Sequence, residues 1–256
     1  MKKLGRMLMR KPKRTDGQIR NALKQEAREQ KLSPNDVYNR FFRELFLAKL
    51  MNHDQGWVLK GGTNLYCRIP GARHTRDLDL YRQDDPTSYR QAAEELVETI
   101  NETTIGPYRF SVTAPKDETV SGTIENINLT VEVFHGVSSV LSFGIDVSGD
   151  LHVPAVTDTL TVKRSDHIDL EFMDREYTIR SYPVENQIAD KVAAMYELHS
   201  HDNQPSTRYR DLYDLALIAL ELSVNAADLA HALNTQAQVR GLTLPQKIRL
   251  PSSTWI

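Results

Sequence analysis

A pair of aspartates lies inside an apolar run, Asp77-Leu78-Asp79-Leu80-Tyr81. If residues 77–81 form a β-strand, side chains two apart project from the same face, so both carboxylates point together while Leu78 and Leu80 face the interior. Two carboxylates held in this way repel each other unless a cation lies between them. Magnesium in proteins typically combines one or two carboxylates with substrate phosphates. The pair is therefore suited to a metal-bound triphosphate.

A glycine pair with a hydroxyl neighbour precedes these carboxylates, in Lys60-Gly61-Gly62-Thr63. Glycines let the backbone approach a phosphate closely, and amides at the start of a following helix would point at it. Taken alone, Gly-Gly is more often a plain turn, and Asp-x-Asp is more often a solvated strand face. The order of strand, Gly-Gly-Thr, helix and Asp-x-Asp strand is nevertheless that of the polymerase-beta-like nucleotidyltransferases, which the chain resembles here.

A third carboxylate is expected on a later strand. In residues 140–147, apolar side chains alternate with Ser142, Gly144 and Asp146, which places Asp146 on the polar face. Two-metal phosphoryl transfer uses ions about 3.5–4 Å apart, and an acid from a neighbouring strand completes their coordination. We expect Asp146 to supply that acid; the alternative is an edge-strand aspartate that contacts only solvent.

The periodicity of the chain predicts the elements that position these residues. Helices are expected at 15–30, from 33 onward, after the Gly-Gly-Thr, from 84 to about 100, and at 184–196, 208–222 and 226–233; strands are expected at 57–59, 77–81, 108–113, 127–134 and 140–147, with short strands and loops over 158–179. Residues 236–256 carry few periodic signals and are left unassigned. The predicted class is α+β: a nucleotidyltransferase domain with a mixed sheet over residues 1–182, followed by a helical domain over 183–256.

Composition restricts the class of protein but not its activity. The chain has 256 residues, 26% charged and 40% apolar, which is ordinary for a soluble globular protein. A net charge of −2 gives no global nucleic-acid signature. One cysteine, Cys67, excludes an internal disulfide framework and fits a reducing compartment. No apolar run approaches the roughly 20 residues needed to span a bilayer, so we expect a cytoplasmic protein without a membrane partner.

The first fourteen residues are strongly basic, and they have two interpretations. One is a solvated tail, and the other is an arm that contacts nucleic-acid phosphates. Leu198-His199-Ser200-His201-Asp202 resembles a metal ligand set only superficially, because no cysteine or spaced partner histidine supports it. We interpret that stretch as a loop at the end of a helix.

The helical half contains Asp190-Lys191 and Arg208-Tyr209-Arg210-Asp211-Leu212-Tyr213-Asp214. On a helix Asp211 shares a face with Asp214 and also with Arg208. A lone helical lysine is usually a snorkelling side chain, and an Arg-Asp pair near a helix start is often an ion pair at the helix end. The residues alone are compatible both with these structural interpretations and with a role in a site.

Five motifs in order make the resemblance specific. Lys-Gly-Gly-Thr, Thr-Arg-Asp-Leu-Asp-Leu, Ile-Asp-Val-Ser-Gly-Asp, Ala-Asp-Lys-Val-Ala-Ala and Arg-Asp-Leu-Tyr-Asp-Leu resemble the motifs of the AbiEii-type nucleotidyltransferase toxins. That family includes abortive-infection toxins of phage defence and the mycobacterial MenT toxins. The resemblance covers residues 57–220. It implies a nucleoside triphosphate substrate, Mg²⁺ or Mn²⁺ as cofactor, and an antitoxin encoded nearby.

The resemblance also assigns roles position by position. The nucleotide contacts it implies are Lys60, Gly61, Gly62, Thr63, Lys191 and Arg208. The metal ligands are Asp77, Asp79 and Asp146, which together with Lys191 and Asp211 form the catalytic set. In some members a hydroxyl residue two positions before the first aspartate is phosphorylated, which makes Thr75 a candidate regulatory residue; a charge added there would repel the triphosphate.

The leading functional hypothesis is a toxin that transfers a nucleoside monophosphate to an RNA acceptor, the 3′ end of tRNA, and so blocks translation. The tRNA acceptor comes from the resemblance to the MenT branch. One alternative keeps the chemistry but modifies a protein or a small molecule. Another is a non-catalytic nucleotide-binding module, which predicts that Asp77→Asn leaves function intact. The sequence contains no Walker-type phosphate loop, no His-Glu-x-x-His and no Gly-x-Ser-x-Gly.

Overall fold

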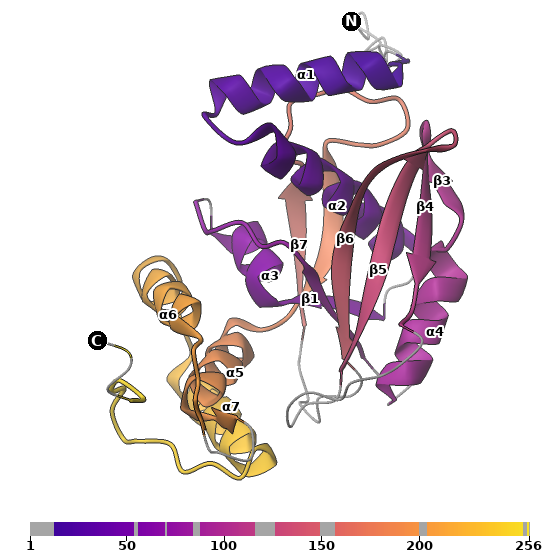
Figure 1. The fold of residues 1–256 in the computed structure, drawn as a ribbon. Helices are drawn as coiled ribbons and strands as arrows, with labels where there is room; N and C mark the ends of the chain where they lie inside the picture. The colour runs from indigo at the N-terminus through magenta and orange to yellow at the C-terminus, as the bar shows by residue number, and fades with distance from the viewer. Residues whose placement is uncertain are drawn as a thin grey trace, which may run out of the picture.

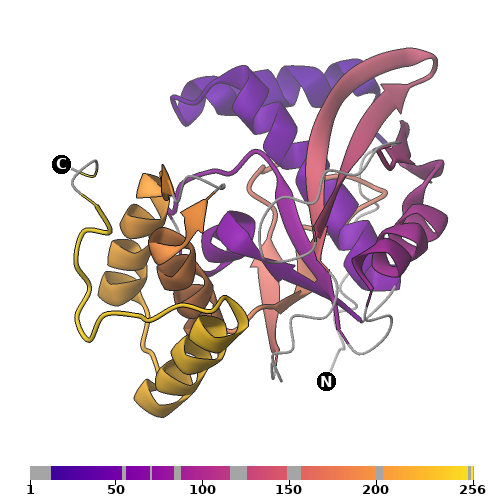
Figure 2. The same cartoon turned by 60° about the horizontal axis from the view of Figure 1, so that its bottom comes forward.

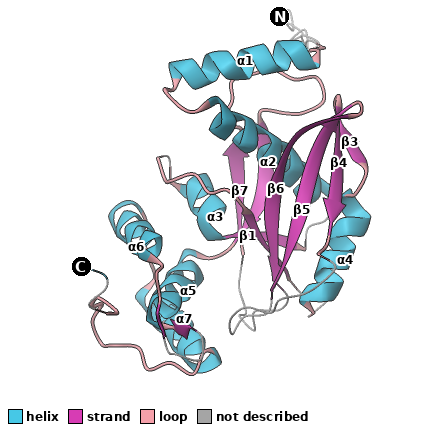
Figure 3. Ribbon diagram, in the orientation of Figure 1, coloured by secondary structure: helices cyan, strands magenta, loops and turns pink. Residues whose placement is uncertain are grey.

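The computed structural model describes residues 13–53, 56–69, 71–83, 88–115, 126–148, 157–199, 204–252 and 255. Helices come first and last along these ranges, and most of the strands follow one another in the middle; Figure 3 shows both by colour. The helices are α1 (Asp16–Glu29), α2 (Pro34–His53), α3 (Gly61–Arg68), α4 (Tyr89–Ile100), α5 (Val184–Tyr196), α6 (Tyr209–Glu221) and α7 (Ala226–Val239). The strands are β1 (Trp57–Lys60), β2 (Leu78–Arg82), β3 (Thr103–Ile105), β4 (Tyr108–Thr113), β5 (Asn126–His135), β6 (Ser138–Ser148), β7 (Asp158–Lys163), β8 (Glu176–Ser181), β9 (Leu198–His199) and β10 (Gln204–Pro205).

An eight-stranded mixed sheet forms the centre of the molecule, in the order β3-β4-β5-β6-β2-β1-β8-β7. The two strands in its middle, β2 and β6, run parallel, while β1 pairs with β2 in the antiparallel sense. Beyond β6 the sheet continues through β5, β4 and β3, and beyond β1 it continues through β8 and β7. The α+β class with a mixed sheet is thereby confirmed.

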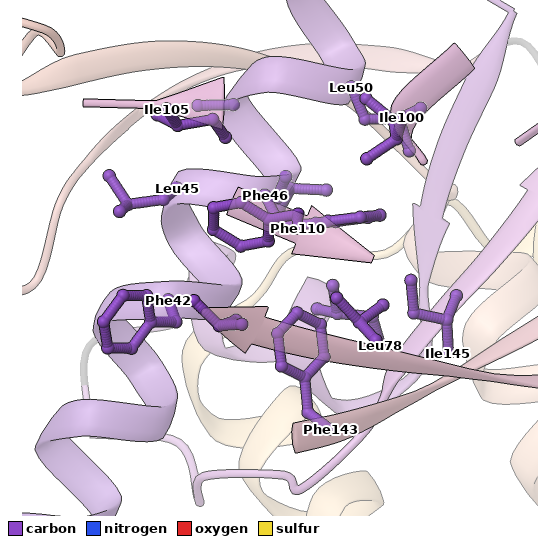
Figure 4. Packing of buried hydrophobic residues seen from close by; sticks show 14 of the residues in the cluster. Phe42, Leu45, Phe46, Leu50, Leu78, Ile100, Ile105, Phe110, Phe143 and Ile145 are labelled. Atoms are coloured by element: carbon purple, nitrogen blue, oxygen red, sulfur yellow. The ribbon is translucent and has the colours of Figure 1, made fainter. Parts of the chain in front are cut away.

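One face of the sheet is buried under α2 and α4. Aromatic side chains of α2, Phe42 and Phe46, meet Phe110 of β4 and Phe143 of β6 in this layer (Figure 4). Phe46 and Phe143 pack edge to face with ring centroids 5.8 Å apart, a favoured aromatic geometry. Because side chains alternate along each strand, burying this face leaves the polar residues of β2, β5 and β6 on the other. No helix stands in front of β4, β5 and β6 in Figure 1.

The leading helices have the starts that the sequence predicts. Thr15 caps α1: its Oγ1 accepts from the Gln18 backbone N–H, and its own backbone N–H donates to Gln18 Oε1, which completes a capping box. Pro34 occupies the first position of α2, where a missing N–H costs nothing. The basic residues 1–12 lie outside the described ranges, as do residues 84–87 before α4 and the histidine-containing residues 200–203.

Helices α5, α6 and α7 form a group beside the sheet (Figure 2). This group packs against α3, because Leu65 and Ile69 lie in one apolar cluster with Val184 of α5 and Ile218 of α6. Helix α7 is longer than predicted and ends at Val239. The second half of α7 is polar in sequence and therefore gave no periodic signal. One of its polar residues, Gln236, is nevertheless buried, and its side chain accepts a hydrogen bond from Arg240.

One further difference from the sequence expectations concerns a strand. Strand β2 begins at Leu78, so Asp77 precedes the strand instead of opening it. The short strands and loops expected over residues 158–179 are confirmed, because β7 and most of β8 lie there, joined by a loop. None of the helices in the described ranges has the length and apolar character that crossing a bilayer requires.

Candidate active site

A row of four polar residues crosses the middle of the sheet. Lys60 of β1 pairs with Asp79 of β2, Asp79 pairs with Asp146 of β6, and Asp146 pairs with Asn128 of β5. Residues paired in register project from the same face of a sheet. The apolar neighbours of this row are buried on the side of α2 and α4. The row therefore lies on the polar face, and it brings Asp79 and Asp146 together although 67 residues separate them in the chain.

The two carboxylates of the row have different surroundings. Asn128 Nδ2 donates to Asp146 Oδ1 at 2.7 Å. Burial raises the pKa of Asp79 to about 6; the ammonium of Lys60 opposes that shift and the charge of Asp146 adds to it. Lys60 itself donates from Nζ to Ser148 Oγ at 2.7 Å, which fixes it beside the pair. A partly buried carboxylate next to a second one is an environment that a cation stabilises.

Asp77 lies before β2 and is exposed. Its carboxylate stands over Gly144 of β6, because a Cβ built on that glycine would lie 2.7 Å from Asp77 Oδ1. A glycine inside a strand often marks such a close approach. Gly144 is two residues before Asp146, just as Asp77 is two residues before Asp79, so the three aspartates occupy one corner of the polar face.

The glycine turn contacts the carboxylate segment directly. Gly61 has φ +67°, and a Cβ at this position would lie 2.0 Å from Asp79 Oδ2. A Cβ on Gly62 would lie 2.1 Å from Thr75 Cγ2. Both positions thus require glycine for space, and Gly61 also requires it for its backbone conformation. The start of α3, with its free amide groups, is held against the carboxylates by these contacts.

Two threonines join the start of α3 to the loop before β2. Thr63 Oγ1 and Thr75 Oγ1 are 2.7 Å apart, and each hydroxyl also lies 3.3 Å from the Asp77 carbonyl oxygen. From the helical group, Gln187 Nε2 donates to the Gly61 carbonyl at 2.8 Å. The turn is therefore fixed from two sides.

Lys191 of α5 is buried in a network of ion pairs. Its Nζ donates to Asp211 Oδ1 and to Asp214 Oδ2, both at 2.7 Å. Arg208 donates to Asp211 at 2.6 Å, and Arg73 binds both oxygens of Asp214 at 2.8 Å. An ammonium group has three N–H donors, so one of the donors of Lys191 remains beyond these two carboxylates.

The charges of this network reach the carboxylate row. Lys191 and Arg208 both act to lower the pKa of Asp79, against the larger effect of burial. Burial acts to raise the pKa of Asp211 as well, but Lys191 and Arg208 lower it below its usual value. The start of α6 and the middle of α5 therefore contribute positive potential to the site. Direct contact of either cation with a nucleotide stays a prediction.

The donor set fits a divalent cation of the hard class. Asp79 and Asp146 offer carboxylate oxygens from neighbouring parallel strands, and Asp77 is next to them. In the described ranges, no group of three or more acidic, histidine or cysteine side chains is already gathered as a ligand set. A site with few protein ligands, completed by substrate phosphates, is the way in which magnesium is usually held.

Several residues of this corner were not among those singled out from the sequence. Asn128, Ser148 and Gln187 bind Asp146, Lys60 and the Gly61 carbonyl, respectively. Arg73 also was not foreseen, although it holds Asp214. None of these four residues has a local sequence pattern that marks it. Gly144 does have one, because a glycine in the middle of an alternating strand often marks a close approach of another group.

Comparison with known proteins identifies one matching family and several solved structures of similar fold. The model of the nucleotidyl transferase AbiEii toxin family, described as a type IV TA system, matches residues 45–253. A search of curated proteins finds no match. The nucleotidyltransferase toxin MenT4 of Mycobacterium tuberculosis H37Rv is similar in structure with a TM-score of 0.56 and 18% identity, over 84% of this chain and 68% of that one. JHP933 of Helicobacter pylori matches with a TM-score of 0.49 and 18% identity, over 81% and 76% of the two chains.

Proposed function

The chain belongs to the AbiEii family of nucleotidyltransferase toxins, and from this premise we propose that it transfers a nucleoside monophosphate to the 3′ end of an RNA, with tRNA as the acceptor. Such an addition at the aminoacylation end would block translation. The observation that carries the proposal is the register row that sets Asp79 beside Asp146, with the glycine turn against them. The family is a toxin of a type IV toxin–antitoxin system, so an antitoxin partner is implied.

The reaction needs positioning and charge stabilisation more than covalent chemistry. The terminal hydroxyl oxygen of the acceptor forms a bond to the α-phosphorus, while the bond from that phosphorus to the β-phosphate oxygen breaks and pyrophosphate leaves. The amides at the start of α3 and the hydroxyl of Thr63 bind the phosphates. Lys60, Lys191 and Arg208 supply positive charge on the side of the leaving group. The Asp79–Asp146 pair takes the hydroxyl proton.

We propose Mg²⁺, or Mn²⁺ in its place, as the cofactor, with Asp77, Asp79 and Asp146 as its ligands. When bound, the ion neutralises charge that develops on the phosphates. The burial of Asp79 supports this assignment, because a carboxylate with a pKa near 6 next to Asp146 gains from a nearby cation. The orientation of the three aspartates is set by protein contacts, through Asn128, Gly61 and Gly144.

We assign a regulatory role to Thr75. Its methyl group touches Gly62 and its hydroxyl is 2.7 Å from that of Thr63. A phosphoryl group on this hydroxyl would carry a charge of about −1.5 to −2 into the turn where the triphosphate binds. It would also displace the start of α3. Phosphorylation of Thr75 would therefore switch the protein off.

A transfer assay tests the proposed function. The protein is incubated with total RNA and each of the four labelled nucleoside triphosphates in turn, with Mg²⁺. We expect label on RNA of tRNA size, removable by an exonuclease that acts from the 3′ end. Label on protein or on a small molecule would assign a different acceptor, and label on larger RNA alone would remove tRNA from the proposal.

A further inference from the structure

Two tyrosines stand on the solvent-facing side of α6, one helical turn apart. Tyr209 is 47% exposed and Tyr213 is 54% exposed. The other side of the helix is buried through Asp211, Asp214 and Leu215. Residues four apart lie on the same face of a helix, so the two rings form one exposed aromatic surface. The ring of Trp255 packs against Tyr209 with centroids 4.7 Å apart, which extends that surface.

The exposed charged residues of the two chain segments that carry or flank these rings have a single sign. In residues 204–216 the two exposed charged side chains are Arg208 and Arg210, because both aspartates there are buried. The C-terminal segment 241–252 carries Lys247 and Arg249 and no acidic residue. This segment runs alongside α6 (Figures 1 and 2). In these two stretches, residues 204–216 and 241–252, every exposed charged side chain is therefore a cation, which fits an anionic partner.

This surface is connected to the carboxylate row through α6 itself. Asp214, the neighbour of Tyr213, holds Lys191 and Arg73. Arg208, the neighbour of Tyr209, donates to Asp211, which also holds Lys191. The two tyrosines therefore stand beside the ion-pair network of α5 and α6.

Exposed aromatic rings interleaved with arginines are the means by which proteins hold single-stranded nucleic acid, since bases stack on the rings while the cations bind the phosphates. We propose that Tyr213 and Tyr209 form a stacking platform for unpaired bases next to the 3′ end of the acceptor, with Arg210 on its backbone. This inference rests on the proposed function, and it names the acceptor as single-stranded at its end. A protein surface, such as an antitoxin, is the competing occupant.

The test compares four substitutions in the full chain, one of which is Arg210→Gln. Tyr213→Ala removes a ring, Tyr213→Phe keeps the ring and removes the hydroxyl, and Leu220→Ala is the matched control, because Leu220 is 82% exposed on the same helix, seven positions on. Binding is measured by fluorescence anisotropy with two labelled RNA hairpins, one with a four-nucleotide 3′ overhang and one blunt. Transfer kinetics are measured with the overhang RNA and, separately, with varied nucleoside triphosphate.

We expect Tyr213→Ala to weaken binding of the overhang RNA at least about fivefold, since one stacked base contributes about 1–3 kcal/mol. The KM for the overhang RNA should rise while the KM for the triphosphate and the binding of the blunt hairpin stay unchanged. Tyr213→Phe and Leu220→Ala should behave like the original protein. Arg210→Gln should weaken binding and reduce the slope of log K against log salt by about one.

Unchanged overhang binding in Tyr213→Ala would overturn the proposal. A rise in the KM for the triphosphate alone would overturn it too and would assign the ring to the incoming base. If the variant instead loses binding to the purified antitoxin and keeps RNA binding, the surface belongs to that protein. The anisotropy measurement reports RNA binding and needs no transfer. Failure of the proposed function would appear as the absence of label on any RNA in the transfer assay. Failure of the platform would appear as unchanged binding of the overhang RNA by Tyr213→Ala.

Discussion

Gly61 lies so close to Asp79 that a Cβ on the glycine would stand 2.0 Å from the carboxylate oxygen Oδ2. The glycine turn and the carboxylate pair are therefore parts of one site, in direct contact across β1 and β2. Because the same residue has φ +67°, any side chain there meets both a steric and a backbone penalty.

Gly61→Ala is expected to abolish transfer, because the methyl group displaces the carboxylate of Asp79. Gly71→Ala separates the two penalties, since Gly71 also has positive φ but has no atom within 4 Å of its added Cβ. We expect Gly71→Ala to lower the free energy of unfolding by about 1 kcal/mol and to leave the transfer rate unchanged. Steady-state transfer and denaturant unfolding measure the two effects. Equal activity of the two variants would contradict a contact between turn and carboxylate.

Asp79→Asn is expected to stabilise the metal-free protein at neutral pH. Burial raises the pKa of Asp79 to about 6, above the value near 3.9 of an unfolded chain. A raised carboxyl pKa contributes stability that is fully present below about pH 4 and is lost as the pH rises through about 6. The asparagine variant has no such loss. Its melting temperature in chelator should therefore exceed that of the original protein at pH 8, and the difference should shrink toward pH 4; a constant difference would contradict the burial argument.

Lys191→Met is expected to destabilise the fold by about 3 kcal/mol or more, because Asp211 and Asp214 lose their common buried partner. Lys163→Met is the matched control. Lys163 pairs with Glu176 at 3.6 Å on the surface, where such a pair contributes little. Denaturant unfolding of both variants measures the difference. If Lys191→Met unfolds like the control while transfer is lost, Lys191 acts on the nucleotide alone and has no structural role.

Thr75→Glu is expected to reduce nucleotide binding by tenfold or more, because it places a carboxylate against Gly62 and Thr63. Thr75→Ser keeps the hydroxyl and should retain activity. Titration with a non-hydrolysable triphosphate analogue gives both affinities. Tight binding by the glutamate variant would remove the basis for regulation at Thr75.

The local part of the site could be predicted from the sequence, because it depends on short-range periodicity. Alternation places Asp79 and Asp146 opposite their buried neighbours, and the glycine pair marks a turn. The register that makes these two aspartates partners depends on long-range pairing of β2 with β6, which no local pattern encodes. For this reason Asn128, which orients Asp146, was not foreseen.

The same limit applies to the helical half. The spacing of Asp211 and Asp214 predicted a common face, and the structure has both buried on it. That Arg73, 141 residues earlier, would bind Asp214 depends on how α6 packs beside the loop before β2. Lys191 was expected as a nucleotide contact. Its two buried ion pairs, with Asp211 and Asp214, also give it a role in stabilising the fold that the sequence did not indicate.

The central claim is that Asp79 and Asp146 act together on a bound triphosphate. The measurement that tests it most directly is the single-turnover transfer rate of Asp79→Asn and Asp146→Asn with saturating Mg²⁺ and nucleotide, on variants shown by circular dichroism to be folded. We predict a loss of at least about 100-fold in each, the scale on which electrostatic stabilisation of a transition state is lost, and a double variant no worse than the more impaired single one. Transfer at the original rate in either variant would contradict the claim.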